Sequence, residues 1–276
     1  MNSLRKIIDA HVHLSERRDD ALVSFARKNR LRYTLDELLG TMRRFGVSRS
    51  LLLSPPLEGG VSLPNTEVLK WCMKSRGMLS PVITVEPTAR EVKAAISLAE
   101  ENKRQLKGFK IRLGYVKGSA ESRVFSSLYD YAESKALPVL FHTGDTAFSN
   151  GDLARAHPLT LDGLANEREE LTIVLCHFGN PWFEDAAELI YKHPNVYADI
   201  SGLTTGGAYA AKYADWLARK ISEAIYFAAG ADKVLFGTDY PVSKHSDVLA
   251  LVRRLKVNEG DKEKILWRNA ERVFTL

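Results

Sequence analysis

Cysteine is scarce in this sequence. The two cysteines, Cys72 and Cys176, lie far apart, and neither belongs to a Cys-x-x-Cys pair. This spacing excludes a disulfide framework and a zinc ribbon as the basis of the fold. We expect Cys176, which directly precedes a histidine, to be a buried packing residue and not a metal ligand or a nucleophile.

Long apolar runs and blocks of like charge are also missing. No apolar run approaches the roughly 20 residues of a membrane-spanning helix, and none precedes the first predicted strand as a signal segment. We therefore expect a cytoplasmic protein without a membrane partner. The net charge is +5 and the pI is about 9.1, but lysine and arginine are spread along the chain. This distribution disfavours a nucleic-acid partner and is consistent with a small, anionic substrate.

A Gly-rich phosphate-binding fingerprint is absent after the first predicted strand, which disfavours an open dinucleotide-binding sheet. The chain instead alternates short apolar runs with amphipathic segments. The predicted strands are residues 6–12, 50–54, 81–85, 108–113, 138–142, 171–177, 195–200 and 233–237. Helical spacing of apolar residues predicts helices near 34–45, 64–76, 89–103, 122–135, 160–169, 182–192, 209–229, 246–258 and 261–274.

This alternation predicts an α/β fold with a parallel sheet, and eight units predict a closed (β/α)8 TIM barrel. Apolar residues make up 45% of the chain, which is enough for one large core, so residues 1–276 are predicted to form a single domain. In such a barrel the active site lies at the C-terminal ends of the strands. The irregular segments 15–33, 55–63, 143–159 and 202–212 are the expected specificity loops.

Side chains that bind metals stand at the ends of four predicted strands. His11 and His13 are two residues apart at the end of the first strand, so they point to the same side. His142 ends the fifth strand, His177 ends the sixth and Asp239 follows the eighth. Each alone is more often a packing or capping residue. Their shared position at one rim predicts that they converge on one divalent ion or on a close pair.

Imidazole and carboxylate ligands suit zinc, manganese or iron. A divalent ion lowers the pKa of bound water toward neutrality, and Asp239 is placed to take the proton as a general base. Asp9 shares the face of the two histidines, and we expect it to orient one of them by a hydrogen bond. The number of metal ions stays open.

The Asp-x-His-x-His strand at residues 9–13, the two later histidines and the Gly-Thr-Asp-Tyr-Pro segment at 237–241 resemble the amidohydrolase superfamily. The resemblance is strongest to its amidohydrolase-related (amidohydrolase 2) family, and it runs from about residue 7 to residue 274. It implies a (β/α)8 barrel with a divalent metal, most often zinc. By match to the motif, His11, His13, His142 and Asp239 are ligands. Asp239 is also the general base, and His177 is a ligand or a hydrogen-bond donor to the transition state.

Three further residues are candidate substrate contacts. Lys110 lies on the fourth strand, where binuclear members of the superfamily carry a carbamylated bridging lysine. We favour a free amine that contacts the substrate or a nearby acid. Arg112, at the mouth of the same strand, is expected either to bind a substrate carboxylate or to face solvent. His245 is a weak candidate, included because it follows Asp239 by only a few residues.

Four other polar residues are expected to have lesser roles. Asp199 and Ser201 end the seventh strand and either line the pocket or, as we favour, cap a loop. His157 and His193 lie in predicted loops and are expected to be solvated.

Members of the resembled family hydrolyse amides, lactones and other esters, and some decarboxylate aromatic or dienoic acids on the same metal site. The prediction is therefore a metal-dependent hydrolase of a small organic substrate that uses a metal-activated water. Non-oxidative decarboxylation of a small carboxylic acid is the alternative, and a catalytically silent metal-binding barrel is the third hypothesis. The substrate stays open, as does the question of whether the protein is a homodimer.

Overall fold

The computed structural model describes residues 6–57, 60–205 and 212–276 of the chain. The strands are β1 (Ile7–His13), β2 (Val47–Leu53), β3 (Leu79–Thr84), β4 (Phe109–Ile111), β5 (Val139–Phe141), β6 (Ile173–Leu175), β7 (Val196–Asp199) and β8 (Val234–Leu235). The α-helices are α1 (Val23–Lys28), α2 (Leu35–Phe45), α3 (Asn65–Lys74), α4 (Ala89–Glu101), α5 (Ser126–Ser134), α6 (Leu153–Ala156), α7 (Asp162–Glu167), α8 (Phe183–Lys192), α10 (Ala214–Phe227), α11 (His245–Arg254), α12 (Glu259–Glu263) and α13 (Asn269–Phe274). Shorter helical segments are η1 (Arg123–Phe125), η2 (Pro158–Leu161), η3 (Cys176–Gly179) and the π-helical η4 (Lys264–Arg268).

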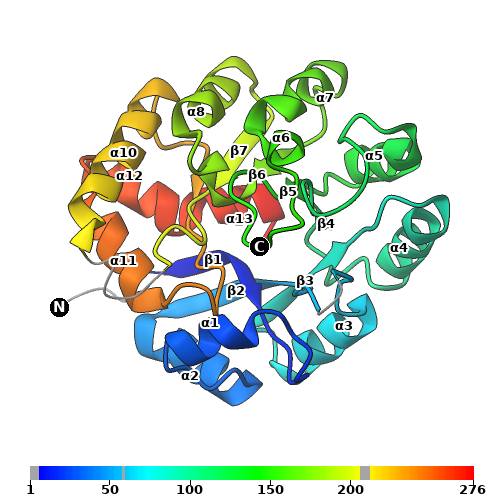
Figure 1. The fold of residues 1–276 in the computed structure, drawn as a ribbon, viewed down its shortest axis with the longest axis horizontal. Helices are drawn as coiled ribbons and strands as arrows, with labels where there is room; N and C mark the ends of the chain where they lie inside the picture. The colour runs from blue at the N-terminus through cyan, green and yellow to red at the C-terminus, as the bar shows by residue number, and fades with distance from the viewer. Residues whose placement is uncertain (1–5, 58–59, 206–211) are drawn as a thin grey trace.

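The eight strands form one parallel sheet in chain order, from β1 to β8. The sheet closes because β1 also bonds to the segment that contains and follows β8. Ala10 N–H donates to the Phe236 carbonyl at 2.8 Å, and His13 N–H donates to the Tyr240 carbonyl at 2.7 Å. The helices surround the strands (Figure 1). The predicted TIM barrel is therefore confirmed.

Alternate residues of the central strands face opposite sides. Val139 and Phe141 of β5 pack outward beneath the helices, whereas Leu140 between them belongs to the separate cluster inside the barrel. The same alternation in β6 places Val174 inside. Both faces of these strands are apolar because both are buried, which is why the sequence shows continuous apolar runs.

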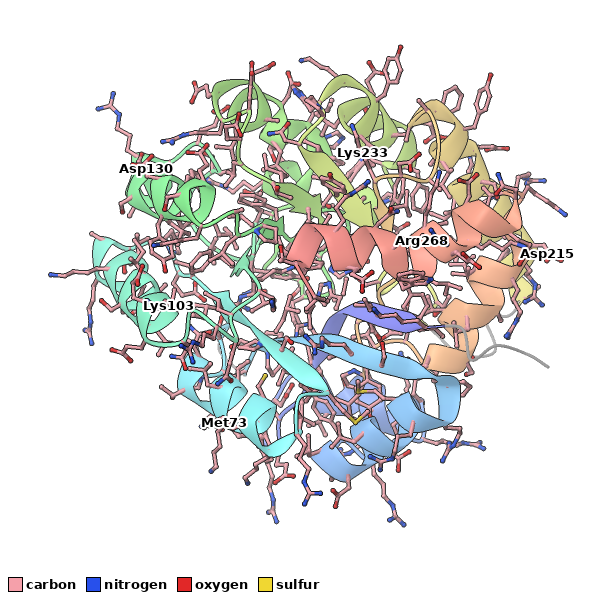
Figure 2. All side chains as sticks on the ribbon, turned by 180° about the vertical axis from the view of Figure 1, so that it is seen from behind. Met73, Lys103, Asp130, Asp215, Lys233 and Arg268 are labelled. Atoms are coloured by element: carbon pink, nitrogen blue, oxygen red, sulfur yellow. The ribbon has the colours of Figure 1, made fainter. Side chains whose placement is uncertain are left out.

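The helix α13 covers the N-terminal end of the barrel. Its residues Ala270, Val273 and Phe274 pack against Ile8 and Leu51 in the inner cluster. Figure 2 shows this face, with the C-terminal helices crossing in front of the strands. Access to the interior is therefore left to the opposite end, where the strands terminate.

The structure differs from the predicted elements mainly in length. The last strand has two residues where 233–237 was expected. The helix expected over 122–135 is divided into η1 and α5, and the one near 160–169 into η2 and α7. The segments 15–33 and 143–159 contain α1 and α6. The helix expected from 209 is described from Ala214 onward, and residues 206–211 lie outside the described residues.

The helix α2 begins after a threonine cap. The Thr34 side chain accepts a hydrogen bond from Glu37 N–H, and the helix ends at Gly46, which has a φ of 73°. A threonine cap and a left-handed glycine satisfy backbone groups at the two ends. No helix in the described parts of the chain is long and apolar enough to cross a bilayer.

Candidate metal centre

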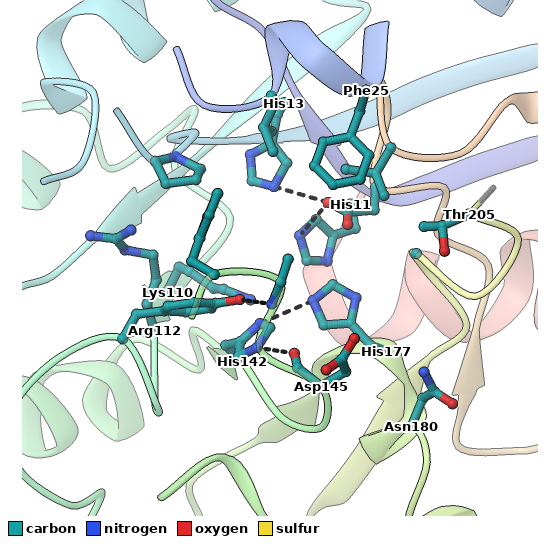
Figure 3. A pocket seen from close by; sticks show the side chains of 18 of the residues that line it. His11, His13, Phe25, Lys110, Arg112, His142, Asp145, His177, Asn180 and Thr205 are labelled. Carbon is teal, nitrogen blue, oxygen red and sulfur yellow. Dashed lines mark hydrogen bonds and ion pairs between the residues drawn. The ribbon is translucent and has the colours of Figure 1, made fainter. Parts of the chain in front are cut away.

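A pocket of about 300 Å³ opens at the C-terminal end of the barrel. All five predicted metal ligands line it, together with both basic residues of β4 and its following loop (Figure 3). Its lining residues are His11, His13, Leu22, Phe25, Ser54, Pro56, Lys110, Arg112, Tyr115, His142, Asp145, Ala147, Phe148, His177, Asn180, Gly202, Leu203, Thr205, Asp239 and Val242. The barrel therefore brings together residues that lie more than 200 positions apart in the chain.

Three of the predicted ligands lie within coordination distance of one another. The Nε2 atom of His13 is 3.1 Å from Oδ1 of Asp239, and Nε2 of His11 is 3.6 Å from the same oxygen. One ligand atom from each of the three residues lies within 4.8 Å of the other two. The two imidazoles and the carboxylate therefore surround a single point at the floor of the pocket.

The nitrogens of His11 and His13 that face this point carry no hydrogen atom. Nδ1 of His13 faces the Leu53 carbonyl at 3.0 Å, and Nδ1 of His11 faces Oδ2 of Asp199 at 3.1 Å. Each Nδ1 must therefore carry the ring proton, and each Nε2 presents a lone pair. Two lone pairs and a carboxylate oxygen repel one another unless a cation lies between them. This donor set fits a divalent metal ion.

The carboxylate that orients His11 is Asp199 and not Asp9. Asp199 is fully buried, and it also accepts hydrogen bonds from the backbone N–H groups of His177 (2.9 Å) and Ser201 (3.0 Å). Burial opposes the charge of Asp199, but the neighbouring His11 ring outweighs it and holds the pKa of the carboxyl well below its usual value. The predicted loop-capping role is thus only part of what Asp199 does.

Asp9 instead fastens β1 to the loop after β8. Its carboxylate accepts hydrogen bonds from the backbone N–H of His11 at 3.1 Å and from Thr238 N–H at 3.0 Å and Oγ1 at 2.7 Å. The expectation that Asp9 orients a ligating imidazole was wrong, because its side chain points toward β8 and lies below the ligands. It positions Asp239 indirectly through the adjacent residue Thr238.

His245 lies beneath the pocket and not in its wall. Its Nε2 atom is 3.1 Å from Oδ2 of Asp9, and its side chain is fully buried. It is not among the described residues that line the pocket. The structure therefore gives His245 no route to a substrate, and its contact with Asp9 explains its position behind Asp239.

His142 and His177 form the opposite side of the cluster. Nε2 of His177 is 3.1 Å from Nδ1 of His142, and Nε2 of His142 is 3.1 Å from the Asp145 carbonyl. The ring centroid of His177 is 5.0 Å from that of His11, so the cluster is continuous. Burial lowers the pKa of His177 to about 4 and that of His142 well below its usual value. Both rings are neutral at pH 7 and can serve as ligands or as hydrogen-bond partners.

The backbone is held in an uncommon conformation at two of these residues. His177 has a φ of 63° and Asp239 a φ of 58°, in the left-handed region that side chains with a Cβ rarely adopt. Gly202, with a φ of 71°, fits closely against both: a Cβ at this position would be 3.0 Å from Nδ1 of His177 and 3.1 Å from Oδ2 of Asp239. Such backbone strain occurs often at functional sites, where neighbouring contacts fix a side chain in place.

Burial also works against the charge of Asp239. The neighbouring rings of His13, His11 and His177 outweigh burial, so the pKa of the Asp239 carboxyl lies below its usual value. Its Oδ1 faces the two imidazoles of β1. Asp239 is therefore ionised at neutral pH, as both a metal ligand and a general base must be.

Lys110 points into the barrel and contacts a thiol. Its Nζ is 2.7 Å from Sγ of Cys176, and it has no ion pair with a carboxylate among the described residues. Cys176 is fully buried, as expected, and burial raises its pKa far above the usual value, so the thiol stays protonated. Lys110 therefore brings to the pocket wall an amine that has no direct carboxylate partner among the described residues.

Arg112 is buried, so the solvent-facing alternative was wrong. One of its terminal nitrogens donates to the Gly60 carbonyl at 2.7 Å and to Oε1 of Glu86 at 3.0 Å. Its buried Nε has no hydrogen-bond partner in the described structure. The guanidinium is thus held in place at one end while the side chain lines the pocket.

A second group of possible ligand atoms consists of His11, Cys176 and Asp199. We assign it no metal, because the oxygens of Asp199 already accept hydrogen bonds from His11, His177 and Ser201. The protonated thiol is also a poor ligand. This group supports the metal centre from below.

Several pocket residues gave no signal in the sequence. Leu22, which precedes α1, and Phe25 within α1 line the pocket. Asn29, just after α1, holds this segment in place through hydrogen bonds from its side-chain amide to the carbonyls of Pro241 (2.8 Å) and Val242 (2.9 Å). Tyr115 lies 4.8 Å from the His142 ring. These apolar and aromatic groups are suited to contact a planar or apolar part of a substrate.

Outside the pocket, His193 is buried and not solvated. Its Nε2 lies 2.7 Å from Oδ1 of Asp162, which also accepts a hydrogen bond from Lys192. His157 is half-buried, and its ring is 4.6 Å from that of Trp182.

A family model described as "Amidohydrolase" matches residues 8–276. The chain belongs to this amidohydrolase family. Among curated proteins, a gamma-resorcylate decarboxylase from Polaromonas sp. strain JS666 is 26% identical over an alignment of 145 residues that covers 47% of this chain and 42% of the relative. The match therefore spans less than half the length of that enzyme.

Solved structures share the fold. An uncharacterised TIM-barrel protein from Bordetella bronchiseptica has a TM-score of 0.78 and 22% identity, covering 98% of both chains. A probable 2-pyrone-4,6-dicarboxylic acid hydrolase from Acinetobacter baumannii, solved with citric acid bound, has a TM-score of 0.69 and 16% identity, covering 98% of this chain and 99% of that one. At these identities the likeness establishes the barrel and not the reaction.

Proposed function

We propose that this amidohydrolase is a metal-dependent hydrolase of a small, carboxylate-bearing substrate. The observation that carries the proposal is the ionised Asp239 carboxylate beside the lone pairs of His11 and His13. A divalent ion held by these residues would polarise a carboxyl-derived group and make a bound water acidic. Asp239 then offers a base within the site, and hydrolysis requires a base to take the proton of the attacking water.

The remaining residues suit the binding of an anion. Lys110 is buried and lacks a carboxylate partner, and Arg112 lies near it in the pocket wall. A substrate carboxylate placed between them would neutralise this charge and form charge-assisted hydrogen bonds. The neutral His177 ring also lines the pocket, and by giving up its contact with His142 it could donate from Nε2 to the oxygen on which negative charge develops.

Non-oxidative decarboxylation is the second candidate, favoured by the similarity to a gamma-resorcylate decarboxylase. The same cations would hold the carboxylate that is lost, and Phe25 or Tyr115 would contact a ring. This reaction delivers a proton to carbon. Asp239 would therefore have to be protonated first, whereas hydrolysis uses its ionised form.

One set of assays separates the two reactions. Metal-loaded protein is given carboxylated lactones, esters and amides in a pH-stat, and hydroxybenzoates with detection of released CO₂. We expect hydrolysis that a chelator abolishes and added zinc or manganese restores. We also expect Asp239→Asn to lower kcat by about 10²–10⁴-fold, the usual contribution of general acid–base catalysis.

Lys110→Met tests the anion contact. It should raise KM for a carboxylated substrate and leave KM for the corresponding methyl ester nearly unchanged. Release of CO₂ without any hydrolysis would replace the first proposal with the second. Turnover of neither class by a fully metal-loaded protein would refute both and leave the catalytically silent barrel.

A further inference from the structure

A second cleft, of about 430 Å³, lies at the opposite end of the barrel. It is formed where β2 and β3 begin and where α3 and α4 end. Ser54, just beyond β2, lines the metal pocket, whereas Arg49 near the start of that strand lines this cleft. Five residues of extended strand separate the two sites by about 17 Å. Figure 2 shows this face, with Met73 and Lys103 labelled near the cleft.

The charged residues that line the cleft are all cations. Arg49 comes from β2, whereas Arg104 and Lys107 come from the segment between α4 and β4. No aspartate or glutamate is among the described lining residues. Neither guanidinium has a hydrogen bond or an ion pair within the described parts of the chain. Positive charge from two segments thus converges without a counter-ion.

The pKa of Lys107 reflects this positive charge. Its Nζ donates to the carbonyl of Thr275 at 2.8 Å, which holds the amine at the cleft but supplies no negative charge. Burial lowers the pKa of Lys107, and the nearby positive charge of Arg49 lowers it further. A bound anion would remove this repulsion.

We infer that this cleft binds a small phosphate-bearing anion. Guanidinium groups bind phosphate oxygens through paired N–H donors, and a lysine adds a point charge. The cleft is also lined by Ser80 and Gln105, which can donate further hydrogen bonds to an anion. Its volume exceeds that of inorganic phosphate, so the ligand class is a phosphomonoester or diphosphate of a small organic group.

The site is independent of the proposed reaction. It lies at the covered end of the barrel, and none of its described lining residues is shared with the metal pocket. A phosphate group bound here would not reach the metal centre.

Titration calorimetry with inorganic phosphate and with pyrophosphate, at low ionic strength, tests the inference on the metal-loaded protein. The double variant Arg49→Gln/Arg104→Gln removes both unpaired guanidinium groups. Lys103→Gln is the matched control, since it removes an exposed cation next to Arg104 that does not line the cleft. Lys110→Gln separates binding in the cleft from binding in the metal pocket.

We expect wild type, Lys103→Gln and Lys110→Gln to bind the anion with similar affinity in one shared binding event. The double variant should bind it about tenfold more weakly or worse, because it loses charge-assisted hydrogen bonds. Circular dichroism and the Tm confirm that the double variant is folded. A crystal soaked in tungstate should show an anomalous peak between Arg49 and Arg104. Equal affinity in the double variant, or no saturable binding of either anion to wild type, would overturn the inference, whatever the outcome of the substrate assays.

Discussion

Replacing Asp199 by asparagine removes one charge and almost no volume. The carboxylate accepts hydrogen bonds from four donors: His11 Nδ1–H, His177 N–H, Ser201 N–H and the Ser201 hydroxyl. An asparagine offers a single oxygen, so its amide NH₂ must face at least one of these donors. The arrangement that keeps both backbone hydrogen bonds places the NH₂ group against His11.

The consequence is a change of tautomer in His11. Opposite an NH₂ group, Nδ1 of His11 becomes the acceptor and the ring proton moves to Nε2, the atom that faces Asp239. A protonated Nε2 cannot ligate a metal. Substitutions of residues that orient metal-binding histidines lower metal affinity by about 10–100-fold. We expect a loss of this size in zinc affinity, with a smaller effect on the stability of the metal-free protein, because the asparagine NH₂ donates to Nδ1 of His11 and leaves no buried group unpaired.

Zinc affinity can be measured by competition with a chromophoric chelator, and stability by urea unfolding of the metal-free protein. Asp162→Asn is the matched control, because Asp162 also pairs with a histidine, His193, but lies far from the pocket lining. The control should bind zinc as the wild type does. If Asp199→Asn also retains wild-type zinc affinity while folded, the assignment of Nε2 of His11 as a ligand atom is refuted.

Two further predictions concern the same site. In the metal-free protein, burial lowers the pKa of His177 from 6.5 to about 4 in the folded state. Between these pH values the unfolded chain binds more protons than the folded protein. The free energy of unfolding therefore falls as the pH decreases from 6.5 to 4. His177→Asn should reduce this loss by up to about 3 kcal/mol, measured by urea unfolding at pH 7 and pH 4.5; an unchanged slope would contradict the buried, neutral ring. Gly202→Ala should destabilise the protein by about 1–3 kcal/mol, because its φ is 71° and the new Cβ would press on His177 and Asp239. A Tm equal to that of wild type would show that this close approach is unimportant.

The barrel could be predicted because its strands have both faces buried. Each strand then appears as an apolar run, and the amphipathic segments between the runs give the parallel order. Chain order and strand polarity together place residues such as His142 and Asp239 at one rim. Their assembly around a shared pocket follows from topology, which is why residues distant in the sequence could be grouped before the structure was known.

The length of the helices was harder to predict. The segment 158–167 consists of the 3-10 turn η2 (Pro158–Leu161) followed by the short α-helix α7 (Asp162–Glu167). Apolar spacing alone does not distinguish these from one continuous helix, because the tighter turn changes the spacing by less than one residue per turn.

The βα alternation and the residue types at the mouth of the barrel could be read from the chain alone, since both depend on local composition and chain order. The partner of each side chain depends on the folded barrel: Asp199 contacts His11, Asp9 contacts His245, and Lys110 contacts Cys176. Such pairings depend on strand stagger and on side-chain rotamers within the closed sheet. A shift of one residue in register would exchange these partners without altering the apolar pattern.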